Sequence, residues 1–277
     1  MCGTCGCSEE SVHLNENRAA ILAPPTYGNL LRLNDLQAER NRQLLDRSRV
    51  LALNLMSAPG SGKTSLLEAT IRALQDSLRI AVIEGDLETE NDALRIRALG
   101  VDVYQITTGT ACHLDARLIS RALQDLDLER LDLLFIENVG NLVCPASFDL
   151  GHHRNVVLLA TTEGDDKPAK YPVLFRTADV VVINKTDLLP FLDDFSIVRA
   201  TDSLRNLASH APMFSLSAKT GADLQPWLDW LEEQVAGYRA LHGQGKTLRP
   251  SFPLDHRKNR APTELRFIPV TSGTALG

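Results

Sequence analysis

Long hydrophobic runs are absent from this sequence of 277 residues. No apolar segment approaches the roughly 20 residues that a membrane-spanning helix needs, and the first residues show neither the basic start nor the apolar core of a secretory signal. An excess of positive charge is absent too, since the formal charge is −6, and this disfavours a broad nucleic-acid surface. We therefore expect a cytoplasmic protein that binds neither membranes nor nucleic acid.

Cysteines are scarce, and the five that occur are not spaced as a disulfide framework. Cys2, Cys5 and Cys7 crowd the start of the chain, whereas Cys112 and Cys144 stand alone. An odd number of cysteines without an export signal favours metal or redox chemistry over structural bridges. The remaining composition, with 44% hydrophobic and 23% charged residues, is typical of a soluble globular protein.

Short β-rich runs alternate with helical stretches through the middle of the chain. Several of the runs are apolar at consecutive positions, as expected when helices cover both faces of a parallel sheet. The pattern predicts an α/β fold with a doubly wound, mostly parallel sheet. The expected strands are residues 51–56, 79–84, 102–106, 132–137, 155–160, 179–184 and 213–217, and the expected helices are residues 64–76, 88–98, 113–127, 196–208 and 223–240.

Periodicity also divides the chain into three regions. Residues 1–28 lack periodicity and contain a Pro-Pro break, which indicates a metal-binding head on a flexible linker. An amphipathic helix over about residues 29–49 opens the main domain, which is expected to span residues 29–243. Residues 244–277, where the pattern stops and prolines and basic residues collect, are expected to form a disordered tail.

The first expected strand runs into the segment SAPGSGKTS, residues 57–65, and then into a helix. This is the Walker A arrangement, with Ser57 in place of the usual first glycine. The glycines let backbone amides approach phosphates, and the helix adds unpaired N–H groups and its positive dipole end. Lys63 would bridge the β and γ phosphates, and the Thr64 hydroxyl would bind Mg²⁺. A glycine-rich turn before a helix is the alternative. The expected nucleotide-binding residues are Pro59, Gly60, Ser61, Gly62, Lys63, Thr64 and Ser65.

A second motif, Asn184-Lys185-Thr186-Asp187, follows the expected strand 179–184 directly. The Asp187 carboxylate can accept hydrogen bonds from both N1–H and the N2 amine of guanine, whereas adenine would present a lone pair. Sites built in this way reject the mismatched analogue by roughly 10⁴-fold or more. Asn184 would order the loop, and the Lys185 stem would cover the ring face. One strand later, a backbone N–H of Ser217-Ala218-Lys219 can donate to guanine O6, so the ligand is predicted to be GTP.

Acidic residues end two further expected strands. We assign Asp86 and Glu137 to the bound Mg²⁺, directly or through water, with solvated loop acids as the alternative. No glutamine occupies the water-orienting position after Gly140, so hydrolysis is expected to be slow unless a second subunit completes the site. Asp92 is a candidate for positioning water. The expected catalytic residues are Lys63, Thr64, Asp86, Asp92 and Glu137.

The first seven residues place three thiolates, from Cys2, Cys5 and Cys7, close enough for a single ion. If the initiator methionine is removed, the free amine of Cys2 becomes a fourth donor. Three sulfurs and one nitrogen suit square-planar Ni²⁺, although Zn²⁺ could take the thiolates tetrahedrally. A cysteine-rich start of no consequence, or disulfide chemistry, is the alternative.

A second metal site is expected inside the main domain. Cys112 and His113 follow the strand 102–106, and Cys144 follows the strand 132–137. In a parallel sheet both loops emerge at the carboxyl edge that holds the phosphates, so the three side chains can meet there. Nucleotide state could then alter metal affinity. Lone cysteines that are buried and inert are the alternative.

The motifs resemble, in order and spacing, the nickel-incorporation GTPases of [NiFe]-hydrogenase maturation, the HypB family. The resemblance implies a GTPase of the SIMIBI class that delivers Ni²⁺, with a second accessory protein, to the hydrogenase large-subunit precursor. It also implies a tight nickel site at the N-terminal cysteines, a second nickel or zinc site at Cys112, His113 and Cys144, and a homodimer. The matching segments are CGTCGC, SAPGSGKTSLL, EGDLETENDA, the Cys112-His113 pair, ENVGNLVCP, TEGDDKPAKYP and NKTDLLP.

Two questions stay open at the level of sequence. The dimer surface is expected at the apolar run just past the guanine motif, which contains Leu188, Leu189, Phe191 and Leu192. The function could also be that of a related urease-type or cobalamin-type G-protein chaperone, or of a nickel-binding module that uses GTP only as a conformational ligand.

Overall fold

The computed structural model describes residues 27–86, 91–109, 111–207, 210–251 and 263–265. The predicted head site at Cys2, Cys5 and Cys7, the adjoining linker and most of the predicted tail lie outside these residues. The main elements in chain order are α2 (Tyr27–Ser48), β1 (Leu51–Met56), α3 (Lys63–Leu74), β2 (Ile80–Asp86), α4 (Asn91–Arg97), β3 (Asp102–Thr107), α5 (Ala116–Asp125), β4 (Leu133–Glu137), β5 (Arg154–Ala160), α6 (Lys167–Lys170), α7 (Pro172–Arg176), β6 (Val180–Asn184), α8 (Ile197–Asn206), β7 (Met213–Ser215), α9 (Gln225–Gly243), β8 (Lys246–Thr247) and β9 (Thr263–Glu264).

Seven strands form one sheet in the order β3-β2-β4-β1-β5-β6-β7, and every neighbouring pair is parallel. Strand β1, which precedes the phosphate loop, lies at the centre between β4 and β5. Strands β1, β4 and β6 are buried along their whole length. Their consecutive apolar residues reflect this two-sided burial. The predicted doubly wound parallel sheet is confirmed.

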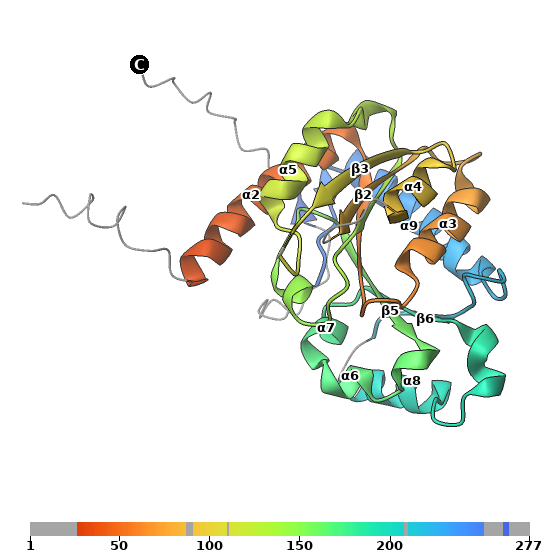
Figure 1. Cartoon of the computed structure of the whole chain (residues 1–277). Helices are drawn as coiled ribbons and strands as arrows, with labels where there is room; N and C mark the ends of the chain where they lie inside the picture. Colours follow the sequence, from red (N-terminus) through yellow and green to blue (C-terminus); the bar gives the residue numbers. More distant parts are fainter. Residues whose placement is uncertain (1–26, 87–90, 110, 208–209, 252–262, 266–277) are drawn as a thin grey trace, which may run out of the picture.

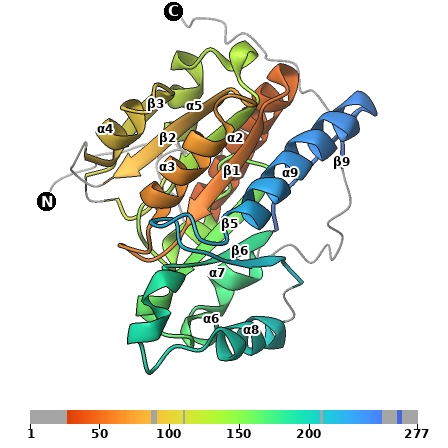
Figure 2. The same cartoon turned by 90° about the vertical axis from the view of Figure 1, so that its right-hand side faces the viewer.

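Helices cover both faces of the sheet (Figures 1 and 2). Helices α3, α4 and α9 lie on one face, where Leu66 and Trp227 belong to one apolar core. Helices α2 and α5 cover the upper part of the opposite face over a second core that contains Ile119. Helices α7 and α8 cover the lower part, where Phe175 and Leu204 belong to a third core. No helix in the described part of the chain is both long and apolar enough to cross a membrane.

The ordered fold continues past residue 243. Strand β8 follows α9 and pairs antiparallel with β9. Thr247 is buried and donates a hydrogen bond to Asp46 of α2 at 2.6 Å, and Asn155 of β5 donates to the Ser251 carbonyl at 3.0 Å. Residues 244–251, the start of the segment expected to be a disordered tail, are thus packed against the domain. Most of the rest of that segment lies outside the described residues.

Two adjacent histidines, His152 and His153, are completely buried before β5. The backbone N–H of Ala52 donates to His153 Nδ1 at 2.9 Å, and His153 Nε2 lies 3.2 Å from Asp46. Burial lowers the pKa of His152 to about 4, so this ring is neutral at neutral pH. Both histidines are therefore structural, and neither lies in the Cys112–His113–Cys144 group described below.

Candidate nucleotide and metal centres

The phosphate loop joins β1 to α3 at the carboxyl edge of the sheet. Gly62 has a φ of +95°, and a Cβ there would lie only 2.5 Å from Asn184 Nδ2, so the position requires glycine. Lys63 is buried, and its Nζ donates to Ser57 Oγ at 3.3 Å. The serine that replaces the usual glycine therefore holds the lysine within the loop. The first turn of α3 has no side-chain cap, which leaves its N–H groups available to phosphates.

Buried acids lie next to this loop. Glu84 and Glu137 are paired across β2 and β4, and the Thr64 hydroxyl donates to Glu137 at 2.9 Å. One carboxylate oxygen of each glutamate is buried without a hydrogen-bond partner among the described residues. Burial, reinforced by the charge of Glu137, raises the pKa of Glu84 to about 8, and burial raises the pKa of Glu137 to about 7. Such a site fits a divalent cation, which would compensate the buried charge.

The other two predicted acids are placed differently. Asp86 ends β2 at the same edge of the sheet and is less buried than Glu84. Asp92 lies in α4 and accepts a hydrogen bond from Arg95 Nη1 at 2.9 Å. The roles of both acids, as magnesium ligand and as water-positioning group, stay predictions.

The two predicted base-recognition loops meet the phosphate loop. Asn184 Nδ2 donates to the Ser61 carbonyl at 3.0 Å, and Asn184 Oδ1 accepts from the backbone of Lys185 and Ala218. The Asp187 carboxylate accepts from Ser217 Oγ at 2.6 Å, which orients it. Asn184 thus joins the loops that follow β1, β6 and β7, whereas the sequence predicted only that it orders its own loop. The contacts of these residues with guanine stay predictions.

These loops line a cavity of about 460 Å³. Its lining includes Lys185, Asp187, Ala218 and Lys219, all of which the sequence assigned to the base. It also includes Gly62 and Ser65 of the phosphate loop, and Glu68, Arg72 and Arg95. The cavity therefore joins the predicted base site to the predicted phosphate site.

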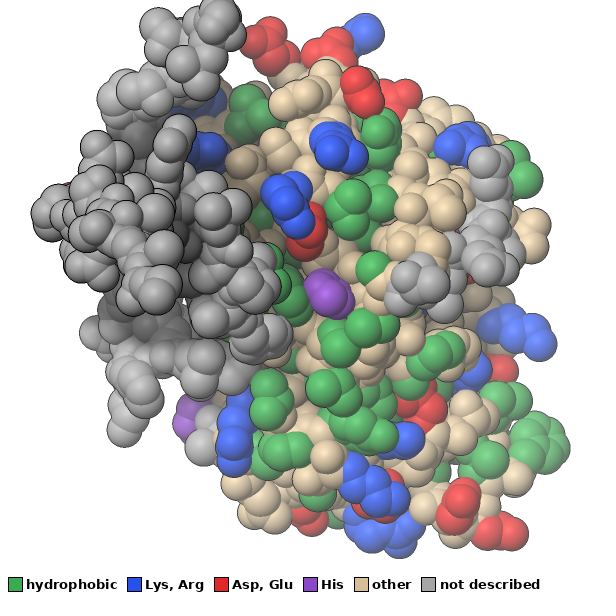
Figure 3. Space-filling model, turned by 60° about the vertical axis from the view of Figure 1, so that its left-hand side comes forward, with side chains coloured by type: hydrophobic (Ala, Val, Ile, Leu, Met, Phe, Trp, Pro, Cys, Tyr) green, Lys and Arg blue, Asp and Glu red, His purple; other side chains and the backbone are tan. Residues whose placement is uncertain are grey.

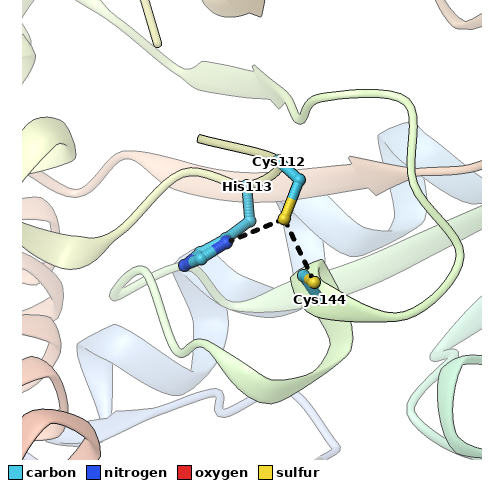
Figure 4. A group of neighbouring side chains, drawn as sticks. All are labelled: Cys112, His113 and Cys144. Carbon is cyan, nitrogen blue, oxygen red and sulfur yellow. Dashed lines mark hydrogen bonds between the residues drawn. The ribbon is translucent and has the colours of Figure 1, made fainter. Parts of the chain in front are cut away.

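The second predicted metal site is assembled at the same edge of the sheet (Figure 4). Cys112 Sγ lies 3.2 Å from Cys144 Sγ and 3.7 Å from His113 Nδ1, and both cysteines are free thiols. The candidate ligand atoms of the three residues all lie within 4.8 Å of one another. The His113 ring stacks on Phe148 at 3.9 Å, and burial lowers its pKa, which favours the neutral form that binds metals. Two sulfurs and one nitrogen suit Zn²⁺ or Ni²⁺ and leave a coordination position open.

The loop after β4 connects the two centres, and its buried residue Asn138 anchors it. Asn138 Oδ1 accepts from the backbone N–H of Leu114, which follows His113, at 3.2 Å. Its Nδ2 donates to Asn54 Oδ1 of β1 at 3.1 Å. Asn138 therefore fixes the start of the loop to the strand before the phosphate loop and to the segment that carries His113.

Further along, the same loop touches both centres directly. Gly140 packs on the phosphate loop so closely that a Cβ there would lie 2.8 Å from Pro59 Cα. Asn141 Nδ2 donates to the Cys112 carbonyl at 3.3 Å, and Cys144 follows three residues later. One short segment thus runs from Glu137, beside Thr64, to a ligand of the candidate metal site.

Sequence reasoning missed several residues of this region. The sequence assigns Asp86 and not Glu84 to the metal, although alternation along β2 places both acids on the same side of the strand. Glu163, whose carboxylate lies 2.5 Å from Ser61 Oγ and accepts from the Ala160 N–H, lies in the segment TEGDDKPAKYP, but nothing in that segment singles it out. Arg95 and Asn138 also have no predicted role, because Glu68 and Asn54, with which they bond, come from distant segments.

Comparisons with known proteins place the chain among nucleotide-binding proteins. Residues 51–215 match the family model described as CobW/HypB/UreG, nucleotide-binding domain. The hydrogenase maturation factor HypB of Rhizobium leguminosarum bv. viciae is 46% identical, over 82% of this chain and 78% of the relative. That of Escherichia coli K12 is 49% identical, over 73% of this chain and 69% of the relative. The crystal structure of HypB from Helicobacter pylori in complex with nickel superposes with a TM-score of 0.70 at 42% identity, over 74% and 95% of the two chains.

Proposed function

The chain belongs to the CobW/HypB/UreG family and, within it, to the HypB hydrogenase maturation factors, and from this we propose that it is a slow GTPase which delivers nickel. In this proposal it acts as a cytoplasmic homodimer, with a second nickel-accessory protein, on the [NiFe]-hydrogenase large-subunit precursor. Nickel is the transported metal, whereas GTP and Mg²⁺ determine the conformation of the protein. The nickel in the Helicobacter pylori structure supports this choice of metal.

The observation that carries the proposal is the loop that joins the two centres. Its first residue, Glu137, accepts from the Thr64 hydroxyl, and Gly140 packs against Pro59. Its later residues bond to the Cys112 carbonyl and supply Cys144. A change at the phosphates would therefore displace a segment that carries a metal ligand. Sub-ångström shifts of this kind alter metal affinity, because coordination tolerates little error in distance.

The nucleotide steps follow from the residues around the phosphate loop. Lys63 would exchange its bond to Ser57 for the β and γ phosphates. Thr64 and Glu137, with Glu84 and Asp86 beside them, would hold Mg²⁺, which supplies positive charge to stabilise the transferred phosphoryl group. Asn141, not glutamine, follows Gly140, and Asp92 is engaged by Arg95, so slow hydrolysis is expected.

Nickel transfer requires a partner to reach the Cys112–His113–Cys144 cluster. One face of the molecule shows hydrophobic side chains gathered over its lower half (Figure 3). Val143, directly before Cys144, is 60% exposed, and Val173 of α7 is 44% exposed. Apolar surface next to the cluster would let a partner dock and exclude water while the metal passes.

The test is nickel binding by the purified protein with and without a GTP analogue. A Cys2/Cys5/Cys7→Ala variant should lose a tight site, and Cys112→Ala should lose a separate site whose affinity depends on nucleotide. Thermal unfolding of each variant controls for misfolding. If neither variant alters nickel binding, the nickel assignment fails while the GTPase assignment stands.

The features that predict slow hydrolysis also favour a second candidate function, a nickel-binding module for which GTP is only a conformational ligand. Single-turnover hydrolysis with and without nickel and partner separates the two functions. The delivery GTPase requires hydrolysis and metal release to change together. The module requires metal release to follow GTP binding and to be independent of hydrolysis.

A further inference from the structure

The nucleotide cavity contains a cation that belongs to none of the nucleotide motifs, Arg95 of α4. We propose that Arg95 binds the phosphate nearest the ribose, the α-phosphate, of the guanine nucleotide and so ties α4 to the nucleotide. The inference rests on the proposed function, since it needs a guanine nucleotide in the cavity.

The lining of the cavity gives the position of that phosphate. The sequence assigns the base to Asp187 and Lys219, which line the cavity. It assigns the β and γ phosphates to Lys63, which follows the lining residue Gly62 in the phosphate loop. The α-phosphate joins these two parts of the ligand, so it falls between them, at the first turn of α3. Ser65 lies in that turn and lines the cavity, and Arg95 Nη2 is 3.4 Å from Ser65 Oγ. The guanidinium therefore lies beside the expected position of the α-phosphate.

The guanidinium is also held in a defined orientation. Glu68 of α3 binds it through two hydrogen bonds, from Nε at 3.1 Å and from Nη2 at 2.9 Å. Asp92, one turn before Arg95 in α4, accepts from Nη1 at 2.9 Å. Because its orientation is fixed before the nucleotide arrives, little conformational entropy is lost on binding. The long contact with Ser65 can be exchanged for a phosphate oxygen without breaking the pair with Glu68.

A purely structural role explains the arrangement less well. The Arg95 side chain is 44% exposed, and surface ion pairs of this kind contribute little to stability. Arg95 lines the cavity next to Ser65 of the phosphate loop. From this position its guanidinium can donate a charge-assisted hydrogen bond to a phosphate oxygen. This contact would therefore tie α4, which begins five residues after Asp86, to the bound nucleotide.

The test is a comparison of GDP with its sulfur-substituted analogues, measured as dissociation constants with Mg²⁺ present. Wild type, Arg95→Ala and Arg97→Ala are each titrated with GDP, with both diastereomers of α-thio-GDP, and with β-thio-GDP. Arg97 is the matched control, because it is an exposed arginine of the same helix. Arg95→Ala should weaken GDP binding by roughly ten- to hundredfold, as expected when a hydrogen bond to a charged group is lost. Arg97→Ala should leave GDP binding unchanged.

The analogues separate direct contact from a structural effect. Wild type should bind one α-thio diastereomer more weakly than GDP, and Arg95→Ala should lose that discrimination while keeping the β-thio effect. Discrimination at the α position that persists in Arg95→Ala would overturn the proposal, and so would wild-type GDP affinity in that variant. Failure of wild type itself to bind GDP would overturn the proposed function as well. Arg95→Lys, which keeps the charge without the planar fork, should bind GDP with intermediate affinity.

Discussion

Gly140 is the residue through which the loop from Glu137 to Cys144 touches the phosphate loop, and Gly140→Ala tests this contact. The added Cβ would lie 2.8 Å from Pro59 Cα, 3.0 Å from Pro59 N and 3.1 Å from Pro59 Cγ. Two of these are backbone atoms, so no side-chain rotation relieves the clash. One loop must move by about 0.6 Å to reach the 3.4 Å at which ordinary contact begins. Overpacking of this kind costs about 1–3 kcal/mol.

Two measurements follow from that magnitude. In a domain of this size a loss of about 1 kcal/mol lowers Tm by about 2–4 °C, so nucleotide-free Gly140→Ala should unfold about 2–12 °C below wild type. In Gly140→Ala, GDP should change the nickel affinity of the Cys112 site less than it does in wild type, because the added methyl group has already displaced the loop from Glu137 to Cys144. Gly237→Ala in α9, which meets nothing within 4 Å, is the control and should stabilise by about 0.5–1 kcal/mol. A wild-type Tm together with a full nucleotide response in Gly140→Ala would refute the reasoning.

Three further predictions concern base recognition, assembly and pH. Asp187→Asn should lower GTP affinity at least tenfold and raise affinity for xanthosine triphosphate, because the 2-oxo group of xanthine accepts a hydrogen bond where guanine has an amine. Competition binding measures both affinities, and unchanged selectivity would exclude Asp187 as the base ligand. The double variant Leu188→Ala, Leu192→Ala should be a monomer in size-exclusion chromatography with light scattering. An intact dimer would show that the dimer interface lies on another surface. Burial raises the pKa of Glu84 to about 8 from 4.5, so folding takes up a proton and the magnesium-free protein should lose stability as pH rises between these values. In thermal unfolding, Glu84→Gln should remove that part of the pH dependence. If the plots of Tm against pH are parallel for wild type and Glu84→Gln, Glu84 is ionised when buried.

Much of the fold could be predicted because its signals are local. Strand β1 begins and ends where the apolar run 51–56 does, and the other six strands of the main sheet occur within two residues of their predicted bounds. Buried parallel strands need continuous apolar runs, and such runs are visible in one sequence. The meeting of Cys112, His113 and Cys144 could also be predicted, because the carboxyl ends of parallel strands share one edge.

The residues that escaped prediction depend on contacts between distant segments. Arg95 reaches Glu68 across 27 positions, and nothing local to α4 marks that partner. His153 lies beside Asp46, 107 positions away, and nothing in the sequence around His153 marks that partner. Residues 244–251 lack periodicity, yet Thr247 is fixed by that same aspartate. Short polar contacts of this kind leave no trace in hydrophobic patterning.

The central position of β1 has a consequence for how such a protein can diversify. Loops after β3 and β4, on one side of β1, carry the Cys112–His113–Cys144 cluster, whereas loops after β6 and β7, on the other side, carry Asp187 and Lys219. The two groups of loops approach the phosphate loop separately, one through Gly140 and the other through Asn184. Residues around the candidate metal cluster could therefore change during evolution without altering the predicted base-recognition residues. Such a change would have to keep the contact of Gly140 with Pro59, because the phosphate loop is where the two halves meet.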